Sequence, residues 1–388
     1  MLVNKSIKLS LFLLCIYATF SLNGHYTHLL LYTAIPTSLV LSWVGTHKPQ
    51  YNIYIGICVS LFLWIVFCSL FAYNIELANR QVHRVVGVFM LVLSIYFLSL
   101  HKKIIPYIYM IWVIMYLACF HYAQNHLLED FDFTQDRVTD SALNANTLGY
   151  YTFFVTSIVF YWGEVVHKRL LKIILHILFL LSIPLSFYVA IITASRQILI
   201  IQIPLIGLLL SLRYFKGKKF GPLILAILVA YFGIYYFGEQ TTDIYEQSYL
   251  NQRYDSGIEN DIRTMLIMDA IKTGIDNPIV GVGPGCCGYY NYGRNSFSHC
   301  TYTELFANTG VLGAFLFISL IVIFMVRQIK RYFKTRDSFY LYFLVVGFIY
   351  ALDNMFYVFY LDPWLMSFFI IIANHSEVYF KSTKHNHE

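Results

Sequence analysis

Charged residues are scarce in this sequence of 388 residues. Asp, Glu, Lys and Arg make up 12% of it, whereas hydrophobic residues make up 58% and aromatic residues 18%. Soluble domains usually carry about 25% charged residues. A soluble protein of this size cannot cover its surface with so few charges. The composition therefore excludes a cytosolic enzyme, a disordered scaffold and a nucleic-acid-binding domain.

The sequence also lacks the usual marks of subdivision and processing. It has no visible internal repeat, and no linker rich in Pro, Gly or Ser divides it. The first apolar segment has a basic start, but no small-residue cleavage site follows it, which favours a retained helix over a removed signal peptide. We therefore expect one polytopic membrane domain over residues 1–388.

Long apolar stretches are present in place of these features. A helix needs about 20 mostly apolar residues to span the hydrocarbon core, and lipid requires every backbone polar group to be satisfied internally. The sequence thus predicts an all-α integral membrane protein of about twelve transmembrane helices. The predicted spans are 9–22, 29–45, 53–73, 85–100, 104–122, 148–166, 173–192, 198–212, 221–237, 303–326, 338–355 and 363–380.

The positions of the basic residues orient these spans. With the N-terminus in the cytoplasm, nineteen of the 27 Lys and Arg residues fall on the cytoplasmic side. The positive-inside rule therefore predicts that both termini are cytoplasmic, and an even number of spans agrees. Eight basic residues remain for the outer side: Arg80, Arg84, Arg137, Arg196, Arg253, Arg263, Lys272 and Arg294.

Two segments between spans face outward in this topology. One covers about 123–147, and the larger, 238–300, lies between the ninth and tenth helices. Long loops without structure of their own are uncommon unless they are functional. Within the larger loop, residues 261–275 have apolar side chains at helical spacing, which predicts an amphipathic helix on the membrane or over the bundle.

Seven cysteines and a glycine-rich turn offer little catalytic chemistry. Four cysteines lie in predicted spans and are expected in the core. On the outer side, a disulfide from Cys300 to Cys286 or Cys287 is an open, less favoured alternative. His299 and these thiols lack the regular spacing of zinc ligands, so we expect no metal site. The segment GVGPGCCG (281–288) is a poor match to a dinucleotide loop, since it contains Pro and follows no strand, and it predicts a tight turn.

The outer arginines are candidates for binding an anion. Arg196 lies in TASRQ (193–197), at the outer membrane edge, where it either faces a polar cavity or snorkels to the interface. Arg253, Arg263 and Arg137, each a solvated charge by itself, could form with Arg196 a pocket of guanidinium groups. Such groups bind phosphate and diphosphate through paired hydrogen bonds.

His299 is the second residue of the segment where the large loop returns to the membrane, SHCTYTELFANTGVLG (298–313). A neutral imidazole there suits a general base, although a structural His is the alternative. Glu304 is five residues further on, a spacing that places the two on different helix faces. Asp353 and Asp362 flank the final outer turn, and each either pairs with an arginine or caps a helix.

Taken together, these motifs resemble the O-antigen polymerase/ligase superfamily of polytopic glycosyltransferases. ASRQ is similar to its Ser/Thr-Arg motif, and IRTMLIMDAIKTGIDNPIVGVGPG (262–285) to its Arg, apolar helix and Pro/Gly segment. SHCTYTELFANTGVLG is similar to its His, Glu and paired-Gly segment, with Cys300 where the family usually has Asn. DRVTDSALNANTLGYY (136–151) is similar to its outer Arg/Asn stretch. The resemblance covers residues 136–313 and implies a catalytic region there.

The resemblance implies a fold and a reaction. The fold would be similar to that of other membrane glycosyltransferases that use lipid carriers, a GT-C-like core. The partner would be an undecaprenyl-diphosphate-linked glycan at the outer, periplasmic face of a bacterial inner membrane, without nucleotide, metal or other cofactor. Arg196 and Arg263 would stabilise the diphosphate, and His299 would accept the proton of the attacking hydroxyl. Arg253, Arg137, Glu304 and Tyr302 are the expected substrate-binding residues.

Three functions remain open at this level. The leading one is a polymerase of lipid-linked repeat units into O-antigen or capsule, acting with a chain-length regulator and a flippase. The nearest alternative is the ligase that passes the finished chain to lipid A–core. A transporter of lipid-linked sugars is disfavoured, because it predicts repeats and charges near the middle of the membrane.

Overall fold

A computed structural model describes residues 5–20, 24–46, 51–127, 144–195, 198–217, 246, 262–290 and 296–384. Within these ranges the regular structure is helical throughout. The helices are α1 (Lys5–Phe20), α2 (Gly24–Gly45), α3 (Ile53–Ser69), α4 (Ile75–Ser99), α5 (Ile105–Leu127), α6 (Ala145–Val165), α7 (Arg169–Thr193), the π-helical η1 (Ile198–Gln202), α8 (Ile203–Gly217), α11 (Ile262–Asp276), α12 (Cys287–Tyr290), α13 (Thr301–Thr335), α14 (Phe339–Asp353), the 3-10 helix η2 (Phe359–Leu361) and α15 (Pro363–Lys384).

The expected all-α membrane architecture agrees with these elements. Eleven of the twelve predicted spans fall on helices, and the ninth, 221–237, lies outside the described residues. Among the described helices, four are long and apolar enough to cross a membrane: Ile75–Ser99, Ile105–Asn125, Arg169–Thr193 and Thr301–Thr335. Three shorter helices are also apolar, at Leu29–Gly45, Ile53–Ser69 and Phe339–Asp353. The protein is therefore a multi-pass membrane protein by composition and helix length.

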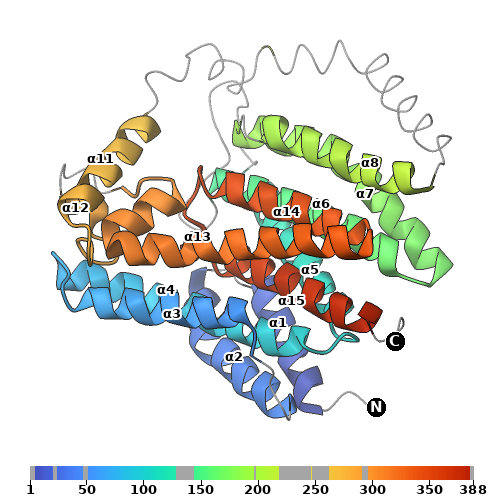
Figure 1. The fold of residues 1–388 in the computed structure, drawn as a ribbon, viewed down its shortest axis with the longest axis horizontal. Helices are drawn as coiled ribbons and strands as arrows, with labels where there is room; N and C mark the ends of the chain where they lie inside the picture. The colour runs from blue at the N-terminus through green and yellow to red at the C-terminus, as the bar shows by residue number, and fades with distance from the viewer. Residues whose placement is uncertain are drawn as a thin grey trace.

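The helices form a bundle with two distinct ends (Figure 1). Helix α13 runs along the bundle and packs against α3, α11 and α14, while α4 packs against α2 and α15. Helices α11 and α12 lie at one end, beside the turn between α3 and α4. Helix α1 begins and α15 ends at the opposite end of the bundle. The helices within the 238–300 segment thus lie at the end remote from these two helix ends.

Aromatic side chains fill much of the core between these helices. Trp112 on α5 is fully buried and packs edge-on against Tyr151, Trp364 and Phe368, with ring centroids 5.6–5.8 Å apart. Such edge-to-face contacts contribute about 0.5–1.5 kcal/mol each beyond the area that they bury. The high aromatic content of the sequence therefore holds α5, α6 and α15 together.

Four consecutive polar residues near the end of α15 join it to other helices. They are Asn374, His375, Ser376 and Glu377, and polar side chains of this kind bind membrane helices to one another. Asn374 bonds to the backbone oxygen of Tyr96 and to the side chains of Asn52 and Ser99, and His375 bonds to the hydroxyls of Tyr109 and Tyr161. Ser376 bonds to Gln328 and Arg331. Glu377 pairs with Arg327 and Arg331. Some of the basic residues assigned to the cytoplasmic side therefore also have a structural role.

Candidate functional site

Helix α13 breaks near its beginning, at Gly310. This glycine has φ 69° and ψ −170°, so the segment before it and the segment after it are separate helices. In an uninterrupted helix, the carbonyl oxygens of Ala307, Asn308 and Thr309 would accept hydrogen bonds from residues four positions later. The break removes those partners, and buried carbonyl groups need new ones.

The turn that follows α11 supplies most of the replacement partners. The N–H groups of Val282 and Gly283 donate to the oxygens of Ala307 and Asn308, at 2.9 and 3.1 Å. The indole Nε1 of Trp64 on α3 donates to the oxygen of Thr309 at 2.8 Å. The expectation of a tight turn at 281–288 is thus confirmed, and the turn completes the hydrogen bonding of a broken membrane helix.

Two glycines make this close packing possible. Gly281 has φ 66° and Gly310 has φ 69°, which are left-handed values that favour glycine. A Cβ atom at Gly281 would overlap the backbone of Asn308, and one at Gly310 would overlap the carbonyl oxygen of Ile279. The glycines of the two sequence motifs therefore face each other's backbones, which explains why both motifs require them.

His299 lies on the backbone immediately before α13. It is half-buried and has φ 59°, an uncommon conformation for a residue with a side chain. The Ser298 hydroxyl donates to the oxygen of Cys300 at 3.0 Å, and the N–H of Thr301 donates to the oxygen of Asn354 at 2.8 Å. Contacts on both sides of His299 therefore hold its backbone in place.

Glu304 connects this backbone to the broken helix. It is 3% exposed, and its carboxylate accepts the N–H of Ser298 at 2.7 Å and the side-chain amide of Asn308 at 2.8 Å. The Oδ1 atom of Asn308 accepts the N–H of Cys287 at 2.9 Å. His299 precedes α13, so the expected placement of His299 and Glu304 on different helix faces does not apply, and Glu304 reaches the backbone beside His299 through Ser298.

The two acidic residues of the final outer turn differ in their surroundings. Asp362 caps α15 by accepting the N–H groups of Trp364 and Leu365, each at 2.9 Å, and it also accepts the Tyr151 hydroxyl at 3.0 Å. Asp353 is fully buried, and within the described part of the chain neither of its carboxyl oxygens has a hydrogen-bond partner. Asp362 is therefore the capping residue of the pair.

The outer cysteines are free thiols in the structure. Burial, followed by the nearby carboxylates of Glu304 and Asp269, raises the pKa of the Cys287 thiol. Burial also raises the pKa of Cys286, whose thiol donates to the oxygen of Asn74 at 3.4 Å. Because the thiolate is the reactive form, these two cysteines act as packing and hydrogen-bonding groups at neutral pH.

Arg263 lies in the first turn of α11, and its side chain is partly exposed. The predicted amphipathic helix is confirmed here, and it packs against α13, with buried Ala270 clustered with Ala307. Tyr302 donates its hydroxyl to the oxygen of Ala351 at 2.8 Å. The other three predicted arginines, Arg196, Arg253 and Arg137, lie outside the described residues.

The sequence interpretation missed several residues that build this region. Asn308 follows Glu304 by four positions, a spacing that places both on one helix face, and this was the available signal. The role of Ser298 and the separation of Asp353 from Asp362 had no comparable signal, since both depend on contacts between distant segments.

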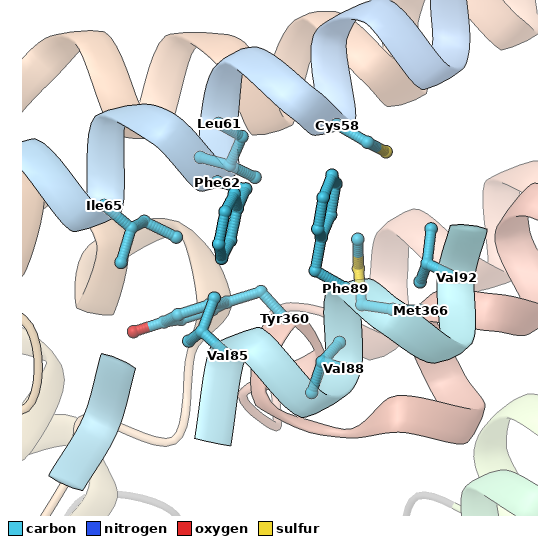
Figure 2. Close-up of a pocket in the computed structure, with 10 residues that line it drawn as sticks. All are labelled: Cys58, Leu61, Phe62, Ile65, Val85, Val88, Phe89, Val92, Tyr360 and Met366. Carbon is cyan, nitrogen blue, oxygen red and sulfur yellow. The ribbon is translucent and has the colours of Figure 1, made fainter. Parts of the chain in front are cut away.

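A cavity between α3 and α4 is apolar (Figure 2). Phe62 and Phe89 lie stacked within it, with ring centroids 4.3 Å apart, and Tyr360 borders it. The other lining residues are Cys58, Leu61, Ile65, Val85, Val88, Val92 and Met366. This cavity has no charged or amide side chain with which to bind a diphosphate.

The described residues define a helical, multi-pass membrane protein in which the two motif segments pack together at one end of the bundle. Residues 177–318 match the model of the O-antigen ligase family, a range that includes α11, the following turn and the first part of α13. This match supports the resemblance of the chain to the O-antigen polymerase/ligase superfamily. No curated protein matches it significantly.

Proposed function

We propose that this protein polymerises undecaprenyl-diphosphate-linked oligosaccharide repeat units into O-antigen or capsular polysaccharide. The observation that carries this proposal is the joint packing of the two motif segments: the turn after α11 completes the broken start of α13, directly after His299. This arrangement brings together the α11 segment that carries Arg263 and the α13 segment that follows His299. The family match spans both.

The proposed reaction is a glycosyl transfer. The acceptor hydroxyl of one lipid-linked glycan attacks the anomeric carbon of another, a new C–O bond forms, and the bond to the diphosphate breaks. His299 accepts the hydroxyl proton as the general base. Arg263 and Arg196 stabilise the charge that develops on the departing lipid diphosphate.

Three further residues are proposed to contact the substrate, and a fourth, Glu304, to act close to it. Arg253 and Arg137 would contact the diphosphate or the glycan, because guanidinium groups bind such oxygens through paired hydrogen bonds. Tyr302 would contribute an aromatic face to a sugar ring. Glu304 belongs to the same region, and its contribution is developed below.

The topology that suits this function has twelve spans, with both termini in the cytoplasm and the 238–300 loop in the periplasm. The common position of the start of α1 and the end of α15, opposite α11, supports it (Figure 1). The catalytic region 136–313 would then face the periplasm of a bacterial inner membrane. A chain-length regulator and a flippase are the proposed protein partners.

A second candidate is the ligase that transfers the finished polymer to lipid A–core. The description of the matching family, O-antigen ligase, favours it. Both reactions use the same lipid-diphosphate donor and differ in the acceptor.

A deletion strain analysed by gel electrophoresis of its surface polysaccharide separates the two. A lost polymerase leaves single repeat units attached to the core, whereas a lost ligase leaves unattached polymer on the lipid carrier. Complementation with His299→Ala tests the site in the same strain. Normal polymer from a His299→Ala protein that is inserted and abundant would contradict the proposed role of His299.

A further inference from the structure

Asn308 is linked through Glu304 to the backbone beside His299, although Asn308 is remote from the surface. It is fully buried within the first segment of α13. Its Nδ2 atom donates to Oε1 of Glu304 at 2.8 Å, while its Oδ1 atom accepts the N–H of Cys287 at 2.9 Å. These two bonds fix the orientation of the amide, because one neighbour accepts and the other donates. Position 308 therefore needs a side chain of the same length as Asn, with one donor and one acceptor.

Glu304 carries the connection on to His299. Its second oxygen, Oε2, accepts the N–H of Ser298 at 2.7 Å, one residue before His299. A continuous path of three hydrogen bonds thus runs from Cys287 through Asn308 and Glu304 to Ser298. It joins the glycine-rich turn to the backbone that holds His299 at φ 59°.

We propose that Asn308 and Glu304 are positioning residues that hold His299 in its reactive place, an inference that rests on the proposed role of His299 as the base. Glu304 acts through the backbone and not on the substrate, because both of its oxygens are engaged internally and the residue is 3% exposed. Residues that fix a catalytic group in this way affect the rate of reaction more than the binding of the donor.

The pattern of donors and acceptors permits an exchange test. In Asn308→Asp, two carboxylates face each other in a buried place and must share a proton. In Glu304→Gln, the side chain has only one oxygen to accept the two donors, the Ser298 N–H and the Asn308 amide. One of the three bonds is therefore lost. In the double variant Glu304→Gln/Asn308→Asp, the amide introduced at position 304 donates to the carboxylate introduced at position 308. That carboxylate still accepts the Cys287 N–H, and all three bonds are restored.

The experiment measures polymer formation from purified lipid-linked repeat units in detergent, with the full-length protein. Glu304→Gln should lower kcat by about 10- to 100-fold, the effect of losing a hydrogen bond to a charged group, and Asn308→Asp should do so at a pH where the shared proton has left. The KM for the donor should change little. The double variant should return kcat to within about threefold of wild type, as expected for directly coupled residues.

A pH profile separates positioning from a general loss of stability. The Asn308→Asp variant should lose kcat as the pH rises and the shared proton leaves. Wild type and the double variant should lack this additional step, because neither has the paired acids. Heat-denaturation midpoints of all variants, measured in the same detergent, report the structural effect by itself.

The outcomes also distinguish this inference from the proposed function. If His299→Ala is inactive but both single variants keep the kcat of wild type, the positioning inference is overturned and the function stands. If His299→Ala is fully active, the role of His299 falls, and the positioning inference falls with it. If the single variants do not fold, the double variant decides alone: a folded double variant as inactive as His299→Ala overturns the inference.

Discussion

The backbone N–H of Val311, the first residue after the break in α13, donates to the carbonyl oxygen of Pro278 at 2.8 Å. This bond anchors the second segment of α13 to the turn after α11, while the turn itself bonds to the first segment. The turn after α11 and helix α13 are therefore one structural unit. Several consequences of this arrangement can be measured.

Gly310→Ala should destabilise the protein strongly. The new Cβ would overlap the carbonyl oxygen of Ile279, at a φ of 69° that disfavours any side chain. The backbone strain alone costs about 1–3 kcal/mol, and displacing the turn adds to it. The heat-denaturation midpoint of the purified protein in detergent should fall clearly, with a lower yield of monodisperse protein.

Gly56→Ala is the matched control for this substitution. Gly56 lies within α3, and apart from its own stretch of that helix nothing lies within 4 Å of the position that its Cβ would occupy. Alanine is favoured over glycine in a helix by about 1 kcal/mol, so the midpoint should stay the same or rise. Equal losses of stability in both variants would contradict the packing account of Gly310.

Glu377→Gln should weaken the end of the bundle opposite α11. Glu377 accepts Arg327 at 2.8 Å and Arg331 at 2.6 Å, and the Arg331 side chain is 10% exposed. Removing one partner of a buried ion pair leaves the other charge uncompensated, and we expect a loss of about 2–4 kcal/mol. Thermal denaturation in detergent measures it, and activity per folded molecule should be retained because this end is remote from His299.

Arg80→Ala is the control for that ion pair. Arg80 pairs with Glu76 one turn away on α4, and both side chains are about three-quarters exposed. Exposed pairs of this kind contribute little to stability, about 0–1 kcal/mol. A fall in midpoint as large as that of Glu377→Gln would show that burial does not explain the difference.

Asp362→Asn should change how stability depends on pH. Burial raises the pKa of Asp362, although hydrogen bonds from the Leu365 N–H and the Tyr151 hydroxyl oppose the shift. The folded protein therefore binds this proton more tightly than the unfolded chain. Its contribution to stability is complete below the unfolded pKa of about 3.9 and is lost as the pH rises through the raised value.

The asparagine variant lacks this titration but keeps an Oδ1 atom for the N–H groups of Trp364 and Leu365. The heat-denaturation midpoint of Asp362→Asn should therefore rise relative to that of wild type as the pH is raised from 4 to about 8. Two denaturation curves that stay parallel over this range would rule out a raised pKa.

Arg263→Lys should impair polymer formation. A guanidinium group binds a diphosphate through two parallel hydrogen bonds, whereas an ammonium group offers only a point charge. Loss of one charge-assisted bond in the transition state would lower kcat/KM by about 10- to 100-fold. Lys272→Arg, a change on the exposed face of the same helix, is the control and should have wild-type activity. Full activity of Arg263→Lys would mean that Arg263 is a surface charge.

Much of the helical framework was predictable because lipid leaves few choices. The apolar runs between Ile53 and Ser69 or between Phe339 and Asp353 cannot be anything but helices in a membrane. Local spacing also predicted α11 and the turn at 281–288. The extension of α4 back to Ile75 was missed, since its first turns carry Glu76, Arg80 and Arg84 and lack an apolar signal.

The break at Gly310 was not predictable, because the sequence around it has the hydropathy of a continuous span. The break depends on the turn 277–283, which lies about thirty residues earlier and supplies the replacement hydrogen bonds. The cap formed by Asp362 and the isolation of Asp353 depend in the same way on neighbours distant in the chain.

The sequence by itself determined the class of this protein, its helices and the residue types that can bind a lipid diphosphate, because these follow from composition and local spacing. Only the tertiary structure decided how the two motif segments meet and how Glu304 and Asn308 reach the backbone before His299. Hydrogen bonds between distant segments depend on how the segments are placed in the fold, and no local sequence pattern specifies that placement. The scarcity of charge first marked a membrane protein, and the folded chain shows where one of its few acidic residues, Glu304, is buried and bonded.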